Sequence, residues 1–487
     1  MSNANLDINL GQGGPAQPLD ETPFRIALLG DFSGRASRGA TDTGPTLTRR
    51  PAWRVDRDDL DDIMREVGPA LRLRLEDGGS GLLIRFESLD DFHPDRLFER
   101  LPLFQALRDL RTRLANPATF KAAAAELVGG APPAASRLPS SASLLGDILD
   151  EAAPADVEEI LADAGGDLHG FIQRVLKPHL VPNPDPRQGE LVAQVEAAAS
   201  ATLRAILHSS EYQALEGLWR ATDLLLRQVE TGAELKVMLI DLSEPELEAA
   251  LPVGGDPGAS PLFRLLAGQA QPEPWSLLVG AYTFGGSAED VERLAQLAAI
   301  GMMLQAPWIS AADPGLAGVG EDPAEVSTWT APSEAWRTFR NTGLARSLGL
   351  VLPRFLARLP YGRGLDVCER FPFEELIPPA SPGQLLWGNP AIMVALVLGR
   401  SFAEHRWALM RGLEPEISGL PVGAVGRGAD AVAVGPGEGP LSVRAADALM
   451  ERGFMVLAPL KESDRARLVR VQSCAQPIAA LAGRWGG

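Results

Sequence analysis

The sequence predicts an α/β fold, because short apolar runs with strand character alternate with amphipathic helices along most of its 487 residues. The clearest unit is an apolar run at 275–284, a helix at 289–304 and a second apolar run at 307–311, with Ser287 as the expected helix cap. A strand, helix, strand unit of this kind normally forms a right-handed parallel crossover. We therefore expect parallel strands in the sheet.

A second observation is the stretch Ile206–Arg220, ILHSSEYQALEGLWR. Ser210 and Gln213 have the spacing of a capping box, and apolar residues then recur at steps of three and four. This pattern predicts an amphipathic helix that begins at Ser210. Most such helices pack in a core, so the stretch alone does not indicate a function.

The first third of the chain predicts a small α/β unit. A polar arm, 1–23, contains the alternating run 6–10, which has the pattern of a lone strand. His93-Pro94 places proline at the start of a helix. The expected elements are, in order, a strand at 24–29, a helix at 58–66, strands at 71–75 and 82–86, and helices at 96–114 and 118–127.

A change of composition divides the chain. The run GGAPPAASRLPSSAS begins at Gly129 and has the composition of a linker, and acidic residues outnumber basic ones as far as position 188. Within it, 143–151 (SLLGDILDE) predicts a short amphipathic helix. We expect domains at 24–128 and 189–487, joined by an acidic linker at 129–188.

The larger domain continues the alternation. A strand is expected at 235–242, and Ser243 with Glu246 has the spacing of a second capping box. The unit 275–311 follows. Further strand and helix patterns lie at 343–358, 384–407 and 445–459.

Composition excludes several functions. Charged residues are 22% and hydrophobic residues 45% of the chain, which is typical of a folded globular protein. A formal net charge of −18 disfavours binding to nucleic acid or to anionic lipid. The two cysteines show no metal or redox spacing, and neither a signal peptide nor a membrane-length apolar run is visible. We expect a cytoplasmic protein without direct membrane insertion.

The sequence nominates no active site. It has no G-x-S-x-G elbow, phosphate loop or H-E-x-x-H helix, and its five histidines lack ligand spacing. The turn Gly30–Gly34 has two glycines where a dinucleotide fingerprint has three. We predict no catalytic, cofactor-binding or metal-binding residue, no cofactor and no enzymatic activity. Arg354 and Arg358, set among apolar residues in LPRFLARLPYG, indicate ion pairs in the core or at an interface.

Taken in order, these runs resemble the sheath proteins of the bacterial type VI secretion system. From about 143 to 477 the chain is similar to the large subunit, TssC. The resemblance rests on ILHSSEYQALEGLWR, LKVMLIDLSEPEL, WSLLVGAYTF, SAEDVERLAQLAAIGMMLQAPWISAADP, WRTFRNTGLARSLGLVLPRFLARLPYG, LLWGNPAIMVALVLGRSFAEHRW, GLPV and VQSCAQP. Residues of these blocks that we expect to be structural or at interfaces are Trp219, Arg220, Arg354, Arg358, Tyr361 and Trp387.

Residues 24–114 resemble the small subunit, TssB. The similar blocks are FRIALLGDFSGR, the loop with Arg49 and Arg50, VDRDDLDDIMREVGPAL and LLIRFESLDDFHPDRLFERLPLFQALRDLRTRL. The family normally divides these parts between two polypeptides, so the chain looks like a fusion. The implied fold is a sheath-protein fold, in which a small TssB-like α/β part packs with a larger TssC-like mixed α/β part.

The resemblance implies a mechanical role. In the family, heterodimers of the two subunits form a helical sheath around a tube of Hcp, and contraction drives the tube outward. The implied partners are further copies of the chain, an Hcp-like tube protein and baseplate components. Segment 143–151 is similar to the TssC helix that the AAA+ ATPase ClpV grips. The expected contact residues for a ClpV-like ATPase are Leu144, Leu145, Ile148 and Leu149.

One departure keeps an alternative open. The family's large subunit continues well past the block that matches VQSCAQP, into a terminal segment that weaves neighbouring subunits together. This chain stops at Gly487. The alternative is a sheath-derived, non-contractile ring, tube or accessory scaffold without that weaving segment.

Overall fold

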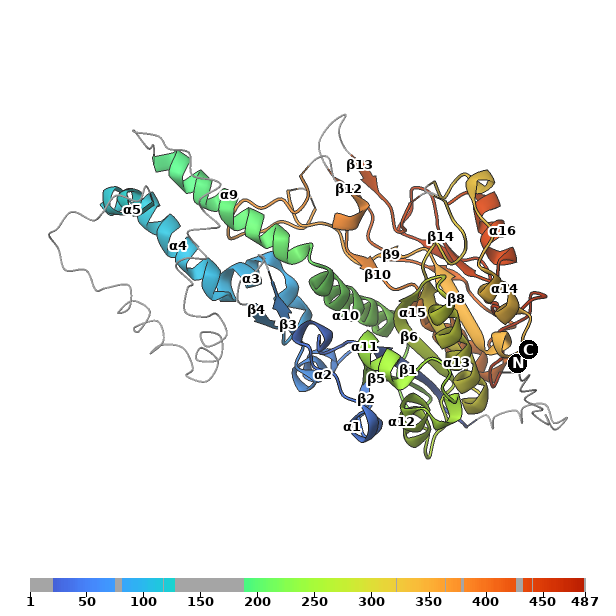
Figure 1. The fold of residues 1–487 in the computed structure, drawn as a ribbon. Coiled ribbons are helices and arrows are strands. Elements are labelled where there is room, and N and C mark those ends of the chain that lie inside the picture. Colours follow the sequence, from blue (N-terminus) through green and yellow to red (C-terminus); the bar gives the residue numbers. More distant parts are fainter. Residues whose placement is uncertain are drawn as a thin grey trace.

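The computed structural model describes residues 21–74, 81–116, 118–127, 188–320, 322–363, 365–377, 381–425, 432–439 and 441–485. Its centre is a nine-stranded mixed sheet (Figure 1). From one edge to the other the strands are β11 (Glu416–Ile417), β15 (Ala466–Leu468), β14 (Met455–Pro459), β8 (Leu348–Leu352), β7 (Trp308–Ala312), β6 (Leu277–Phe284), β1 (Phe24–Gly30), β5 (Leu235–Asp241) and β2 (Trp53–Val55).

The middle of this sheet is parallel and its edges are antiparallel. Each neighbouring pair from β14 through β8, β7, β6 and β1 to β5 is parallel. At one edge β2 runs antiparallel to β5. At the other edge β15 runs antiparallel to both of its neighbours, β14 and β11. The predicted unit 275–311 is confirmed as β6, the helix α13 (Ala288–Leu304) and β7, with the two strands parallel.

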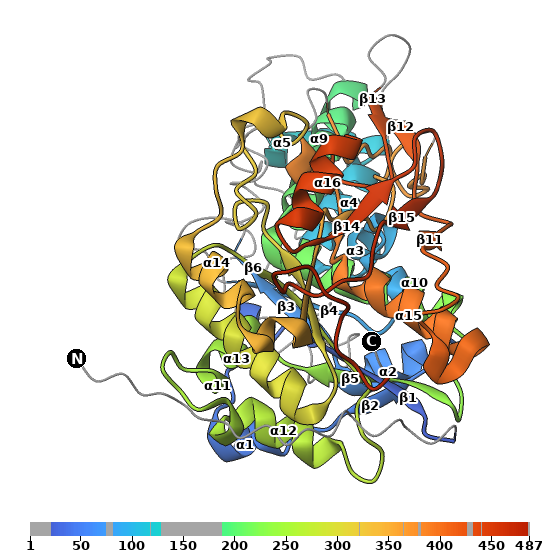
Figure 2. The ribbon, with the colours of Figure 1, turned by 90° about the vertical axis from the view of Figure 1, so that its right-hand side faces the viewer.

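Helices cover both faces of the sheet, as the view in Figure 2 shows. One face carries α10 (Ser210–Gln228) and α15 (Ala391–His405), with α2 (Leu60–Val67) in the same core. The opposite face carries α13 and, around it, α1 (Gly44–Thr48), α11 (Glu244–Ala250), α12 (Pro261–Gln269), α14 (Glu334–Arg340) and α16 (Val443–Glu451).

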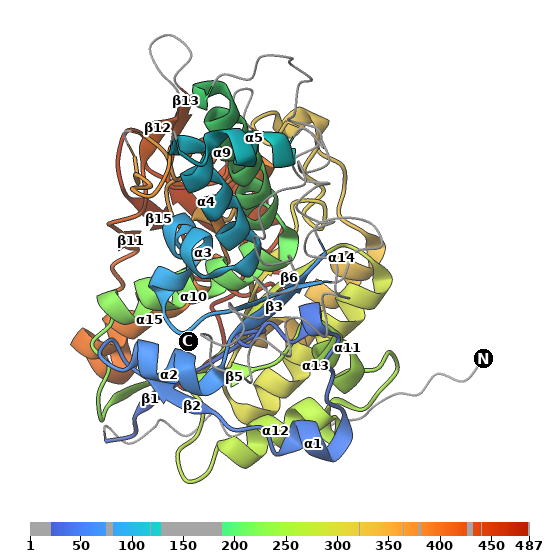
Figure 3. The ribbon, with the colours of Figure 1, turned by 90° about the vertical axis from the view of Figure 1, so that its left-hand side faces the viewer.

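A group of helices extends from the sheet (Figures 1 and 3). It consists of α3 (Pro94–Arg100), α4 (Pro102–Ala115), α5 (Phe120–Leu127) and α9 (Gln188–Leu207). Helix α4 packs along α9, where Arg111 Nε donates to Glu196 Oε1 at 2.7 Å. The described residues also form three two-stranded sheets: β3 (Ala70–Leu73) with β4 (Leu82–Arg85), β9 (Phe355–Leu356) with β10 (Trp387–Gly388), and β12 (Gly423–Val425) with β13 (Val432–Val434).

Two local predictions are wrong. The single helix expected at 96–114 is divided into α3 and α4, because Pro102 has no amide hydrogen and disfavours a helical conformation at Leu101, which is extended. Ser210 and Gln213 form no capping box: the cap of α10 is Ser209, whose hydroxyl donates back to Ile206 O at 2.8 Å. Gln213 instead donates to Gly383 O at 3.3 Å.

Other local predictions are confirmed. The Ser243 and Glu246 capping box starts α11, and the Ser287 side chain caps α13 by accepting from the Asp290 amide. The strand expected at 6–10 and the helix expected at 143–151 lie outside the described residues. In the part of the chain that the structure describes, no helix has the length and apolar character of a membrane span.

Candidate functional site: the seam between the two parts of the chain

The N-terminal part (21–127) and the C-terminal part (188–485) share one sheet. Strand β1 of the N-terminal part lies between β5 and β6 of the C-terminal part and is parallel to both. Its register with β5 runs without interruption from Phe24 opposite Leu235 to Gly30 opposite Asp241. All residues of β1 are buried. We call the whole contact between the two parts the seam.

The side chains of β1 alternate between the two hydrophobic cores. Phe24, Ile26 and Leu28 pack in the core under α10 and α15, whereas Ala27 and Leu29 pack in the core under α13. This is the alternation that an extended strand gives to a sheet covered on both faces. Each core of the C-terminal part is therefore completed by residues of the N-terminal part.

A buried ion-pair network lies where β1 and β5 end. Arg50 donates to both carboxylate oxygens of Glu246, each at 2.8 Å, in a forked pair that crosses the seam. Arg50 also donates to Asp42 Oδ2 at 2.8 Å, and the Asp42 amide donates to Glu246 Oε1 at 2.7 Å. Arg50 and Glu246 are 5% and 0% exposed, so this pair is shielded from water.

Asp241 extends the network to the turn after β1. It accepts from the amide of Ser33 at 2.9 Å and from its hydroxyl at 2.8 Å. Arg35 bridges Asp241 Oδ2 at 3.4 Å and Asp42 Oδ2 at 2.7 Å. The Gly30–Gly34 turn is thus bound by a side chain of the C-terminal part.

The network sets the protonation of its carboxyl groups. Burial favours the neutral form of Glu246, but hydrogen bonds from Arg50 and from the amides of Asp42 and Ser243 outweigh it and lower its pKa to about 2. Asp31 behaves in the opposite way: burial, and then the charges of Asp241 and Glu246, raise its pKa despite two backbone hydrogen bonds. Glu246 is therefore held in its ionised form, whereas burial shifts Asp31 toward its neutral form.

Aromatic residues form a second group of seam contacts. Trp219 of α10 donates from Nε1 to Phe32 O at 2.9 Å, and the two rings meet edge to face with centroids 5.1 Å apart. Tyr212 of α10 donates to Phe92 O at 2.7 Å, and Phe92 stacks on Phe86 at 4.1 Å. Helix α10, predicted as a packing helix, holds the N-terminal part by these two side chains.

A third contact is made by the described residues of 359–363 and 365–377, which we call the strap. Just before it, Arg358 lies between two carboxylates: Nε donates to Glu216 Oε1 at 2.8 Å and Nη1 to Glu375 Oε2 at 2.7 Å. The Tyr361 amide donates to Glu375 at 2.8 Å. Burial disfavours the charge of Arg358, but Glu216 and Glu375 outweigh it and raise its pKa well above the usual value.

Arg220 and Tyr361 complete this cluster. Arg220 Nε donates to Glu216 Oε1 at 2.7 Å, and Arg220 Nη2 donates to the Tyr361 hydroxyl at 3.0 Å. The Arg358 guanidinium lies over the Tyr361 ring, 4.1 Å from its centroid. Three residues expected to be structural thus belong to one cluster, in which Arg220 and Arg358 share Glu216 and each contacts Tyr361.

The other side of the strap lies on the N-terminal part. Asp95 accepts from the amide of Glu369 at 2.8 Å and from the amide of Arg370 at 3.2 Å. The Phe371 ring packs on Phe98 with centroids 4.4 Å apart, and Arg370 pairs with Glu99. The strap therefore joins the Arg358 cluster to helix α3 across the seam.

The remaining predicted residues lie elsewhere. Arg354 is half exposed and forms a forked pair with Glu438, away from Arg358. Trp387 of β10 lies beside α10, where a Cβ at Gly217 would stand 2.8 Å from the Trp387 carbonyl oxygen, so this close approach needs glycine. Leu144, Leu145, Ile148 and Leu149 lie outside the described residues.

The sequence did not reveal the partners in these clusters. Glu216, Glu246 and Glu375 look like ordinary helix or loop carboxylates, and only pairing across distant segments shows their role. Arg50 was visible as part of a family-like loop. A signal that could have found Asp241 is its place as an acidic residue at the end of an apolar strand.

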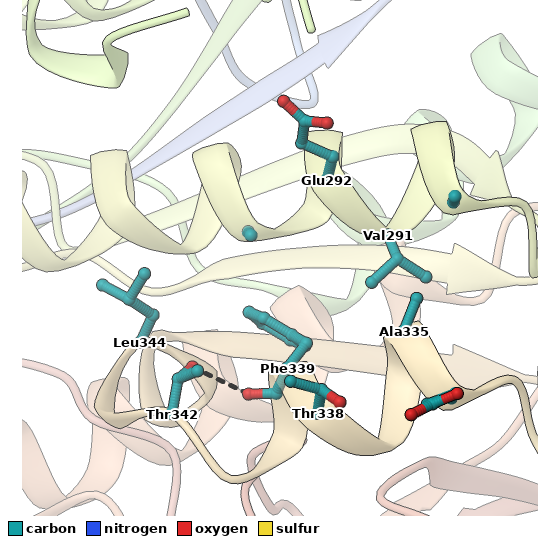
Figure 4. Close-up of a pocket in the computed structure, with 10 residues that line it drawn as sticks. Val291, Glu292, Ala335, Thr338, Phe339, Thr342 and Leu344 are labelled. Atoms are coloured by element: carbon teal, nitrogen blue, oxygen red, sulfur yellow. Dashed lines mark hydrogen bonds between the residues drawn. The ribbon is translucent and has the colours of Figure 1, made fainter. Parts of the chain in front are cut away.

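A shallow groove lies between α13 and α14 (Figure 4). Val291, Ala335, Phe339 and Leu344 meet in it, whereas the Glu292 carboxylate points away and binds the Gly254 amide. Its lining is mostly apolar, with Glu334, Thr338 and Thr342 as its other polar residues. Among the described residues, no group of three or more His, Cys, Asp or Glu is placed to hold a metal ion.

The fold and the seam define a structural protein, in which the buried charges bind one another across a shared sheet. Comparison with known families agrees: residues 189–475 match the family described as VipB, EvpB/VC_A0108, tail sheath N-terminal domain. The chain belongs to this tail sheath family. Residues 6–124 match a second family, described as type VI secretion system, VipA, VC_A0107 or Hcp2. The chain thus joins a TssB-like part to a TssC-like part.

A curated relative supports the same assignment. The chain is 36% identical over 304 residues to the type VI secretion system sheath protein TssC1 of Pseudomonas aeruginosa. The matched region is 59% of this chain and 61% of the relative, so the chain spans less than two thirds of the length of that relative.

Proposed function

We propose that this chain is a single-chain protomer of a type VI secretion-like contractile sheath. It polymerises around an Hcp-like inner tube, attaches to baseplate components, and drives the tube outward on contraction. The observation that carries this proposal is the insertion of β1 between β5 and β6, which makes the TssB-like part an integral layer of the TssC-like body. A protomer of this kind transmits force through a continuous sheet.

The seam supports the mechanical part of the proposal. Buried forked ion pairs resist separation, because breaking one leaves an uncompensated charge away from water. The Arg50–Glu246 pair is of this kind and crosses the seam, whereas the Arg358 cluster lies within the C-terminal part and fixes the strap that contacts α3. Two parts held in this way behave as one rigid unit while neighbouring copies move against each other.

We assign no chemical reaction to the chain. The polar clusters described above are occupied by partners within the protein, and the family is one of structural proteins. The segment 143–151 is proposed as the recognition element for a ClpV-like ATPase, on its similarity to the amino-terminal TssC helix.

Electron microscopy of the purified full chain, alone and with an Hcp-like protein, tests the function. The proposal expects hollow helical tubes whose bore is filled when the Hcp-like protein is present. Closed rings, or tubes that exclude it, would support the alternative of a non-contractile scaffold. A chain that stays monomeric at high concentration contradicts both.

A further inference from the structure

Residues 479–485 lie past 189–475, the region that matches the tail sheath family. They form neither helix nor strand, yet they pack firmly on the body of the protein. Leu481 is fully buried, and Trp485 is only 7% exposed; both belong to the core under α10 and α15. These two apolar side chains anchor the segment to the same core that receives one face of β1.

The segment crosses the amino ends of neighbouring parallel strands. The Ala482 amide donates to Arg346 O at 2.8 Å, two residues before β8 begins. Arg484 donates from Nη2 to Leu304 O at 3.2 Å, ahead of β7, and from Nε to Trp275 O at 3.1 Å, ahead of β6. The contacts thus follow the order of the strands in the sheet, β8, β7 and β6, and β1 is next in that order.

The last contact of the segment crosses the seam. The Trp485 ring packs on the ring of Phe24, the first residue of β1, with centroids 6.0 Å apart. Phe402 and Trp407 pack on the same phenylalanine, with centroids 4.9 Å and 5.8 Å from it. Three aromatic rings of the C-terminal part therefore meet the residue with which the N-terminal part enters the sheet.

Trp275 provides a second link between the segment and β1. Its carbonyl oxygen accepts from Arg484, and its ring lies under the Arg25 guanidinium, 4.1 Å from the ring centroid. Arg25 is the second residue of β1 and is 6% exposed. The first two residues of the strand are thus both held at this edge of the sheet, one directly by the segment and one through Trp275.

The opposite end of β1 is held in a different way. There the Arg50–Glu246 pair and the hydrogen bonds from Ser33 to Asp241 fix the turn that follows the strand. Local opening of a structure starts most easily at exposed ends with few buried contacts. A central strand such as β1 is therefore retained best when both of its ends are fixed, one here by charge and the other by aromatic packing.

We propose that residues 479–485 are a lock that retains β1 between β5 and β6. While Trp485 covers Phe24 and Arg484 fixes Trp275, the amino end of β1 cannot fray from its neighbours. Trp485 and Arg484 are positioning residues in this lock, because they act on the sheet through Phe24 and Trp275. The lock keeps the TssB-like part attached to the TssC-like body, and it does so whether or not the sheath contracts.

Hydrogen–deuterium exchange of the full chain tests the lock. Trp485→Ala should lower the protection of peptides that cover β1 by about tenfold or more, because it leaves a cavity beside Phe24. Peptides of β7 and β8 should keep their protection. Trp485→Phe should restore the protection of β1, since an aromatic ring still packs on Phe24. The indole Nε1 that this variant lacks has no hydrogen-bond partner among the described residues.

The matched control is Trp336→Ala, which removes another buried tryptophan. The Trp336 ring packs on Phe339 and Phe454, both in the TssC-like part. A lock predicts that this control leaves the ratio of protection between β1 and β7 as in the wild type, whereas Trp485→Ala lowers that ratio.

Two results would overturn the proposal. One is a Trp485→Ala chain in which β1 is protected as in the wild type. The other is a chain in which β1, β7 and β8 lose protection equally, because Trp485 is then an ordinary core residue. If Trp485→Ala does not fold, Arg484→Ala decides by the same ratio. The loss of its two hydrogen bonds should lower the protection of β1 by about threefold to tenfold, and an unchanged ratio would refute the lock.

Discussion

Arg50 of the TssB-like part and Glu246 of the TssC-like part form a forked ion pair, with both hydrogen bonds at 2.8 Å and both side chains buried. The pair crosses the seam at the end of β1 and β5, where the Glu246 carboxylate also accepts from backbone amides of both parts. The two sheath parts of this chain are thus joined by charge as well as by strand pairing.

Replacing one partner of this pair should destabilise the protein strongly. Arg50→Ala leaves Glu246 ionised and buried, and breaking a buried pair in this way costs about 3–5 kcal/mol. Urea unfolding should show the loss as a lower midpoint. Arg227→Ala removes an exposed pair with Asp223 and should cost under about 0.5 kcal/mol. Equal midpoints for the two variants would show that the seam pair does not hold the parts together.

Acid should weaken the seam through Glu246. Its folded pKa of about 2 lies below the value near 4.5 of a free glutamate, so its contribution is complete above 4.5 and disappears as the pH falls toward 2. The melting temperature should therefore fall more steeply from pH 6 to pH 2 for the wild type than for Glu246→Gln. At pH 6 the melting temperature of Glu246→Gln should already be lower than that of the wild type. Parallel curves would contradict this role of Glu246.

The covalent link between the parts should be dispensable once the chain has folded. A protease site placed between 128 and 187 gives two fragments, which the shared sheet should hold as a 1:1 complex on gel filtration. Residues 188–485 expressed alone should aggregate, since β5 and β6 then lack the strand between them. Fragments that separate after cleavage would argue against the shared sheet.

Charge reversal at the two arginines of LPRFLARLPYG, Arg354 and Arg358, should have very different effects on folding. Arg358→Glu places a third carboxylate beside Glu216 and Glu375 and should prevent folding. Arg354→Glu places a half-exposed carboxylate beside Glu438 and should leave folding intact, with a loss of about 1 kcal/mol or less. The two variants are compared by their yield of soluble protein and by circular dichroism. A folded Arg358→Glu chain would show that the cluster is not required for the fold.

The segment 143–151 should matter for recycling rather than for assembly. Replacing Leu145, Ile148 and Leu149 with Ala removes the apolar face that we assign to a ClpV-like ATPase. Assembly seen by electron microscopy should stay normal while binding in a pull-down falls. Undiminished binding would remove the assignment.

The sequence predicted the α/β class and most individual elements, because apolar periodicity and helix caps are local. The place of β1 between β5 and β6 was not predictable in this way, since strand order depends on contacts between residues more than 200 positions apart. The partners of Arg358 were hidden for the same reason. The break at Pro102 had a local signal, the missing amide of proline, that a continuous apolar pattern obscured.

The most direct test of the single-chain sheath is cryo-electron microscopy of tubes formed by the full chain, before and after triggering in the presence of an Hcp-like tube. We predict one chain per subunit of the tube, with β1 between β5 and β6 both before and after triggering. The rise per subunit should differ between the two states. Closed rings, or tubes with one fixed rise that never release the inner tube, would contradict it.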